Sequence, residues 1–374
     1  MQMELGARRP KLQLTEHRGA EALTALAPQW DALAERVHPG QPFVRHGFLR
    51  LWVEAFHPGR LRVLTVSEEG GRLVAALPLR CATEHQWGMP MRGLSAAANA
   101  HSCRFDFLAE NPWESGPLVL DHLIATGGWD RLLLRDVPEG GAGEILFELA
   151  RRRGLPVGRW ESLRSPYFTL PDTMEEMHAR LDTRFKANLR RRRRKLAKEG
   201  PVQLERCEGG PRLARCLEEG LALEASGWKR RRGSAILQDV ATRRFYLSLA
   251  AEAAREGTLA LYLLRVGERP VAFQFSLQQG RRYFLLKPGY DESLSACSPG
   301  QLLMEDVVGD LIGRGVREFD FLGPDMVWKR DWTDRVRVHT WFSIFPAHGW
   351  GRVLHATKFR AAPAIKAAMG GWRS

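Results

Sequence analysis

The segment Ser298–Gln301, which reads SPGQ, has the residue types of an anion-binding helix start. It follows the apolar run RRYFLLKPGY and precedes LLMEDVVGDLIGRG, in which Leu303, Val307 and Leu311 recur every four residues. That spacing predicts a helix, and Pro299 suits its first turn because the N–H that proline lacks would be unpaired there. Backbone N–H groups and the positive end of the helix dipole then favour a phosphate. The alternative is a strand–helix–strand unit that binds nothing at this turn.

Three residues are candidates for proton transfer. His101 lies in the small, polar loop AAANAHSCRF, and imidazole titrates near neutral pH; the alternative is a surface histidine. Asp320 lies between Phe319 and Phe321, where desolvation raises the pKa of a carboxyl. Strand alternation turns it to the face opposite both rings, where it either meets solvent or pairs with an arginine. Glu224 precedes a Trp-Lys pair by one helical turn, and its alternative is an ion-paired carboxylate on a helix surface.

The dipeptide Trp-Lys occurs at Trp228-Lys229 and again at Trp328-Lys329. A tryptophan can form the wall of a pocket while the neighbouring lysine meets an anion. The alternative is a pair of core tryptophans with exposed lysines. Tyr290, in the sequence PGYD, is either a functional phenol or an aromatic residue that stabilises a turn.

The elements that must position these residues recur along the chain. Two strands around a Gly-Gly turn follow residue 60, and a similar pair with a Gly-containing turn follows residue 258. The later strand RLLLRDVP has a counterpart in REFDFLGP. Such repetition indicates two similar α/β units with mixed sheets in tandem, and the alternative is a chance likeness between amphipathic hairpins. We expect a first domain at residues 1–164, a second at 165–346 and a basic tail at 347–374.

A run of five arginines, Arg190–Arg194, lies within the sequence LDTRFKANLRRRRRKLAK. Leu181, Phe185, Leu189 and Leu196 form one stripe at helical spacing, so the helix should pack by that stripe and expose its arginines. A solvated basic face is one interpretation; attraction to an anionic membrane or a phosphorylated donor is the other. Nucleic acid is disfavoured, because no aromatic platform accompanies the charge.

Composition sets wider bounds. The 374 residues carry a net charge of +13, which points to anionic partners. No apolar run approaches the roughly 20 residues of a membrane span, and the N-terminus lacks the apolar region of a secretory signal. We therefore expect a cytoplasmic protein with peripheral contact to the inner face of the membrane. Five widely spaced cysteines without a CxxC pair predict neither disulfides nor a metal site.

The second half resembles the GNAT-type acyltransferases of the BioF2-like group, which is also described for the CelD proteins of cellulose biosynthesis. The segments FKANLRRRRRKLAKEG, RPVAFQFSL, KPGYDESLSACSPGQLL and FDFLGPDMVWKRDWT carry the resemblance in this order. The first half, with PFVRHGFLRLW and NAHSCRFDFL, looks like the degenerate partner domain of this group. Such proteins are similar to FemA and FemX, which have two GNAT units in one chain.

The resemblance implies transfer of an acyl group to an amine. In ordinary GNAT domains the helix after the fourth strand binds the coenzyme A pyrophosphate through a Gln/Arg-x-x-Gly-x-Gly/Ala loop. This chain has SPGQ instead, so an acyl carrier protein is an alternative to acyl-CoA as the donor. We expect catalytic roles for His101, Asp320, Glu224 and Tyr290, the last as the acid for the leaving thiolate. We expect donor binding by Lys287, Ser298, Gly300, Gln301, Trp228, Lys229 and Lys329.

The expected enzyme is an N-acyltransferase whose acceptor is an amine on an envelope lipid, such as a sphingoid base, or on a glycan. One alternative is a FemX-like transferase that uses aminoacyl-tRNA. Another is a non-catalytic accessory protein of polysaccharide biosynthesis.

Overall fold

The computed structural model describes residues 11–56, 61–86, 88–226 and 236–361. The chain divides into two compact units: Met1–Ser162 with His339–Ser374 form unit 1, and Leu163–Val338 form unit 2. The chain therefore passes from unit 1 into unit 2 and back again. The domain limits predicted from the sequence, at 164/165 and 346/347, stay predictions.

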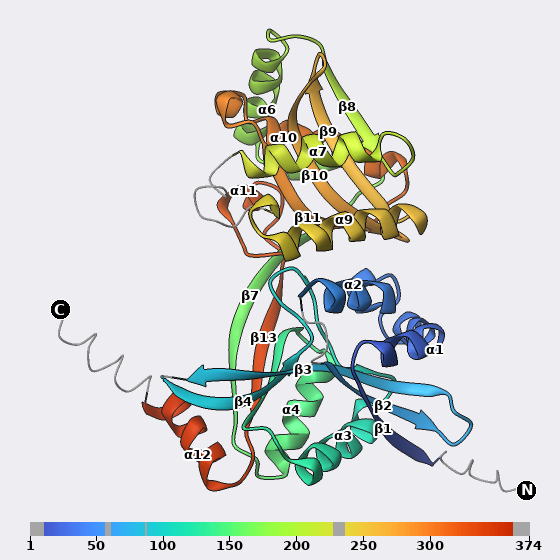
Figure 1. Ribbon diagram of the computed structural model, residues 1–374. Coiled ribbons are helices and arrows are strands. Elements are labelled where there is room, and N and C mark those ends of the chain that lie inside the picture. Colours follow the sequence, from blue (N-terminus) through green and yellow to red (C-terminus); the bar gives the residue numbers. More distant parts are fainter. Residues whose placement is uncertain (1–10, 57–60, 87, 227–235, 362–374) are drawn as a thin grey trace, which may run out of the picture. The chain divides into compact units, whose positions relative to one another are not determined.

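Unit 1 is a mixed sheet covered by helices (Figure 1). Its strands follow the order β1-β2-β3-β4-β6-β13, with β5 paired to β3. Its elements are β1 (Leu12–Arg18), α1 (Glu21–Val37), η1 (Pro42–Val44), α2 (His46–Phe56), β2 (Leu61–Glu68), β3 (Leu73–Gln86), β4 (Met89–Ala96), β5 (Leu108–Ala109), α3 (Pro112–Thr126), β6 (Arg131–Pro138), α4 (Ala142–Arg152), the first part of β7 (Val157–Thr169), the last part of β13 (Val336–Ile344), α12 (Gly349–Ala356) and η4 (Thr357–Ala361).

Unit 2 repeats this plan with the strand order β7-β12-β11-β10-β9-β8. Its remaining elements are α5 (Met174–Arg180), α6 (Thr183–Leu196), β8 (Val202–Cys207), α7 (Leu213–Ala225), η2 (Ile236–Gln238), α9 (Val240–Arg255), β9 (Leu259–Val266), β10 (Arg269–Gln279), β11 (Arg282–Tyr290), η3 (Glu292–Cys297), α10 (Pro299–Gly313), β12 (Glu318–Asp320) and α11 (Val327–Arg330).

The two units share one sequence of strand pairings. In each, an antiparallel hairpin (β2–β3 or β9–β10) leads into a third antiparallel strand (β4 or β11). A helix (α3 or α10) then leads to a strand that is parallel to that third strand (β6 or β12). The mixed α/β fold class predicted from the sequence is thus confirmed.

The sheet of unit 2 is buried on both faces. Strand β9 is buried along its whole length, as an apolar strand covered on two sides must be. Phe275 of β10 packs edge-on against Tyr246 of α9, and Phe273 lies against α7. The hydroxyl of Tyr262, on β9, donates 2.6 Å to Asp310 of α10. Helices α7 and α9 therefore cover one face of the sheet, and α10 covers the other.

Helix α6 packs largely as its pattern predicts. Asp182 caps it by accepting a 3.0 Å hydrogen bond from the N–H of Phe185. Phe185, Leu189 and Leu196 are buried and join the core of unit 2. Leu181 is buried too, but it precedes the helix rather than belonging to it.

Part of the expected basic tail packs on unit 1. Leu354 of α12 is fully buried against Met91 and Phe345, with Phe359 beside them. Residues 349–361 thus form α12 and η4, and residues 362–374 lie outside the described residues. Within the described part of the chain, no helix is both long and apolar enough to cross a membrane.

Candidate functional site

The predicted anion site is the junction of η3 and α10. Ser298 adopts the left-handed conformation with φ of 45°, and its carbonyl accepts from the N–H groups of Gln301 (3.0 Å) and Leu302 (3.3 Å). Pro299 occupies the first helical position, as expected, so Gly300 is the first residue of α10 that carries an N–H. A Cβ added to Gly300 would lie 3.7 Å from the ring of Tyr290. The structure therefore brings Tyr290, Ser298, Gly300 and Gln301 together.

The strands beneath this junction separate. Strand β11 pairs in parallel with β12 only from Arg282 to Phe284, opposite Glu318 to Asp320. It then continues to Tyr290 alongside β10, after an irregularity in the pairing at Phe275. The parallel pairing of β11 and β12 therefore ends at Asp320, while β11 continues beside β10 as far as Tyr290.

Gln301 connects α10 to the segment that contains Lys329. Its side-chain N–H donates to the carbonyl of Trp328 (3.1 Å), and its amide oxygen accepts from the indole of Trp332 (2.7 Å). The two bonding partners, Trp328 and Trp332, lie on either side of Lys329 in the sequence. The geometry gives Gln301 a positioning role, and direct contact with a donor stays a prediction.

Lys329 is buried, with 4% of its surface exposed. Its ammonium donates to the carbonyls of Leu322 (2.6 Å) and Pro324 (2.8 Å). The turn that presents these carbonyls is left-handed at Leu322 (φ 49°) and Gly323 (φ 58°). Burial lowers the pKa of Lys329 to about 8, although the carboxylates of Asp320 and Asp325 oppose that fall. The sequence alternative of an exposed lysine beside a core tryptophan is wrong for this residue.

Asp320 pairs with an arginine, which is one of the two alternatives that strand alternation left open. It is 1% exposed and accepts 2.6 Å from Arg337 and 2.9 Å from the N–H of Leu322. Arg337 also donates 2.7 Å to Glu318 and stacks 3.8 Å above the ring centre of Tyr167. Asp320 thereby fixes both an arginine and the turn that holds Lys329, and its action as a base stays a prediction.

Replacing Asp320 by Asn should lower the pKa of Lys329 below its value of about 8, because the carboxylate favours the ammonium form. NMR titration of lysine labelled at Cε measures this pKa directly. Asp325→Asn is the matched control, since Asp325 acts on Lys329 in the same direction but less strongly. Equal shifts in both variants, or no shift in Asp320→Asn, would contradict the assigned coupling.

Glu224 lies near the end of α7, beside the last residues of β11. It is 2% exposed, and its carboxylate accepts 2.9 Å from the N–H of Ile236, the first residue of η2. Gly289 of β11 packs directly on its backbone: a Cβ there would lie 2.6 Å from the Glu224 nitrogen. Because Gly289 immediately precedes Tyr290 in β11, Glu224 lies close to Tyr290. Its burial rules out the alternative interpretation of a carboxylate on the helix surface.

The other predicted residues are placed as follows. Lys287, on β11, holds its ammonium 5.4 Å from the ring centre of Tyr246. Trp228 and Lys229 lie outside the described residues. His101 belongs to unit 1, whereas the other described candidates belong to unit 2. Its ring stacks on Phe56 at 5.6 Å with an interplanar angle of 7°.

Two further features of the candidate site give no recognisable signal in the sequence. Arg337 lies in the alternating strand VRVHTWFSI, where nothing distinguishes it from a solvated arginine. Tyr167 ends up beneath the guanidinium only because β7 and β12 pair. Among the residues the structure describes, no group of three or more His, Cys, Asp or Glu side chains is arranged to hold a metal ion.

Comparison with known proteins agrees with this geometry. Residues 183–330 match the family model described as "Acetyltransferase (GNAT) domain". No curated protein matches the chain by sequence.

Solved structures share the fold at low sequence identity. FemX aligns with a TM-score of 0.55 at 11% identity, covering 89% of this chain and 97% of its own. The C-terminal domain of a lysylphosphatidylglycerol synthetase from Agrobacterium fabrum aligns at 0.53 and 11%, covering 90% and 96%. L-PGS from Bacillus licheniformis aligns at 0.51 and 10%, covering 88% and 94%.

These likenesses show a shared mixed α/β fold, and the sequence match falls within unit 2, which carries most of the candidate residues. Residues 183–330 thus match a GNAT acetyltransferase domain in sequence, and this match supports acyltransferase as the enzyme class.

Proposed function

We propose that this protein is an N-acyltransferase that moves an acyl group from an acyl thioester to an amine on an envelope lipid or glycan, as in the BioF2-like group. The observation that carries the proposal is the joining of two features by one residue. Gln301 links the start of α10, where Tyr290 lies beside Gly300, to the segment from Trp328 to Trp332 that contains the buried Lys329. The anion site suits the phosphate of a donor, the phenol can protonate a leaving thiolate, and the buried cation can stabilise an oxyanion.

Each part has a step in the reaction. The amine attacks the thioester carbonyl, and the carbonyl oxygen gains negative charge that Lys329 stabilises. The C–S bond then breaks, and Tyr290 donates its phenolic proton to the leaving thiolate. A base accepts the proton that the amine loses; Glu224, Asp320 and His101 are the candidates. The N-terminal end of α10 attracts the phosphate of the donor.

Acyl-CoA is the first donor to test, and an acyl carrier protein with its phosphopantetheine arm is the second. We expect acyl-CoA to raise the melting temperature, because a ligand at about 100 times its Kd stabilises the folded state by roughly 2.7 kcal/mol. Gly300→Asp should abolish this rise, since it places a carboxylate at the start of α10. Gly313→Asp adds the same charge at the other, exposed end of the helix and should keep it.

The chemistry itself is tested by mass spectrometry of the product formed from acyl-CoA and an amino lipid, with His101→Ala assayed in parallel. Failure of every thioester donor both to stabilise the protein and to yield an acylated amine would contradict the proposal.

A second candidate is an aminoacyl-tRNA-dependent transferase. The shared fold with FemX and with the lysylphosphatidylglycerol synthetases favours it, as does the arginine-rich face of α6. This candidate predicts transfer that ribonuclease abolishes and that acyl-CoA does not support.

A further inference from the structure

Helix α6 concentrates positive charge that the rest of the molecule does not neutralise. It bears eight basic residues and no acidic one: Arg184, Lys186, Arg190, Arg191, Arg192, Arg193, Arg194 and Lys195. Only Arg193, within the described part of the chain, forms ion pairs: it lies 2.8 Å from Glu305 and 2.6 Å from Asp306 of α10. Arginines elsewhere in unit 2, such as Arg206 and Arg265, each pair with two carboxylates.

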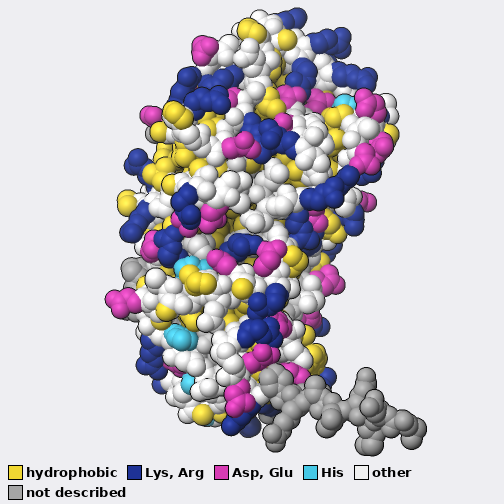
Figure 2. All heavy atoms as spheres, turned by 90° about the vertical axis from the view of Figure 1, so that its right-hand side faces the viewer, with side chains coloured by type: hydrophobic (Ala, Val, Ile, Leu, Met, Phe, Trp, Pro, Cys, Tyr) yellow, Lys and Arg dark blue, Asp and Glu magenta, His cyan; other side chains and the backbone are white. Residues whose placement is uncertain are grey.

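This excess of positive charge destabilises α6 itself. Like charges four residues apart, such as Arg190 and Arg194, repel each other on a helix surface. A surface helix can be solvated equally well by basic and acidic side chains together. The face drawn in Figure 2 shows such a mixture, with basic and acidic side chains interspersed. The uncompensated charge of α6 therefore indicates an anionic partner.

The short helix α11 and its N-cap residue Met326 expose apolar side chains, and the residues that follow α11 contact α6. Val327 is 79% exposed and Met326 is 37% exposed. The segment that follows α11 contacts α6 through the edge-on packing of Trp332 on Phe185, whose ring centres lie 5.5 Å apart. Arg192 also lies close enough to Asp331 to oppose the rise in pKa that burial causes in that carboxyl. A basic face thus borders an apolar tip, next to the turn that holds Lys329.

This combination suits a bilayer better than a nucleic acid. Basic side chains meet lipid phosphates while short apolar side chains enter the headgroup region. A single-stranded nucleic acid would instead need exposed aromatic rings on which its bases stack. Trp328, the aromatic residue of α11, packs edge-on against Phe321 at 5.4 Å.

We propose that the exposed basic side chains of α6, together with Met326 and Val327, form a docking surface for the anionic surface of a bilayer. This extends the proposed function, on which it rests for the identity of the acceptor: the bilayer would present an amino lipid to the site beside Lys329.

Sedimentation of the full chain with vesicles at physiological salt tests the proposal. We expect binding to vesicles of equal parts phosphatidylglycerol and phosphatidylcholine, and none to phosphatidylcholine alone. Arg190→Gln with Arg194→Gln should weaken binding about 25-fold, because each basic residue near an anionic surface contributes about fivefold. Val327→Glu should weaken binding without changing α6.

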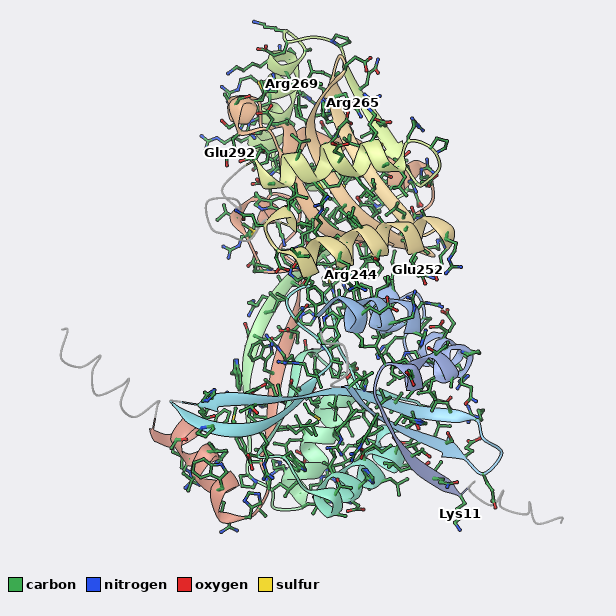
Figure 3. The ribbon with its side chains drawn as sticks, viewed as in Figure 1. Lys11, Arg244, Glu252, Arg265, Arg269 and Glu292 are labelled. Carbon is green, nitrogen blue, oxygen red and sulfur yellow. The ribbon has the colours of Figure 1, made fainter. Side chains whose placement is uncertain are left out.

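The matched control is Arg243→Gln with Arg244→Gln. It removes the same charge from exposed positions of α9, which lies away from α6 within unit 2 (Figure 1, with Arg244 labelled in Figure 3), and should leave binding intact. Equal losses in the two double variants would overturn the proposal, because they would show a response to net charge alone. Binding of bulk tRNA without binding of anionic vesicles would overturn it in favour of a nucleic acid.

Acylation of a short, water-soluble amine separates the two proposals. Turnover of that acceptor without vesicle binding would leave the proposed function and remove the docking surface. Vesicle binding without turnover from any thioester donor would do the reverse.

Discussion

Lys329→Met is expected to lower kcat/KM for acyl transfer by roughly 10²- to 10³-fold, the loss seen when one preorganised donor to an oxyanion is removed. An ammonium has three N–H donors. The carbonyls of Leu322 and Pro324 accept two of them and so fix the direction of the third. Because the side chain is 4% exposed, its charge acts through a medium that screens it far less than water does. Steady-state kinetics at pH 7 measures the loss, which should fall mainly on kcat.

The same assignment sets a pH dependence. The Lys329 pKa of about 8 means that the ammonium form dominates below that pH and is lost above it. Activity of the unmodified protein should therefore fall as the pH rises through about 8. Arg330→Met is the matched control: Arg330 is exposed, pairs with Asp325 at 3.0 Å, and should be dispensable for turnover. If Lys329→Met melts at a lower temperature yet turns over as fast as Arg330→Met, Lys329 serves only to hold its turn.

Gly289→Ala is expected to destabilise unit 2 by about 3 kcal/mol, at the upper end of the usual cost of overpacking. The added Cβ would lie 2.6 Å from the nitrogen and 2.7 Å from the Cα of Glu224. Both atoms belong to the backbone of α7, so relief requires the helix to move off the end of β11. That movement also displaces Glu224 and Tyr290, so activity should fall with stability.

The urea midpoint of the unit 2 transition measures this loss. Gly313→Ala, at the exposed end of α10, is the control: no atom lies within 4 Å of its added Cβ, and a gain of roughly 0.5–1 kcal/mol is expected. Equal midpoints for the two variants would show that α7 can shift at little cost.

The sequence predicts correctly those parts of the fold that depend on residues close together in the chain. The four-residue spacing of Leu303, Val307 and Leu311, with Pro299 in front, predicts a helix, and α10 runs from Pro299 to Gly313. The stripe of α6 was predicted for the same reason. The inclusion of Leu181 in that stripe is wrong, because spacing alone does not reveal that Asp182 caps the helix and that α6 begins at Thr183.

The candidate site depends on causes that are not local. Alternation predicted which face Asp320 occupies, but the partner on that face, Arg337, comes from a strand that begins later in the chain. The burial of Lys329 depends on two carbonyls that a left-handed turn redirects. The sequence around Lys329, including Pro324-Asp325 and Trp328-Lys329, does not by itself indicate such a turn.

The double passage of the chain between its units has a consequence for synthesis. Residues 339–344 of β13 pair with β6, and Phe342 and Ile344 of that strand belong to the unit 1 core. A ribosome completes these residues only after it has made all of unit 2. The sheet of unit 1 therefore stays incomplete, without this strand, until the whole of unit 2 has been made. A fragment that stops at residue 164 would lack the strand that closes its own core, so the two units cannot be separated by a single cut.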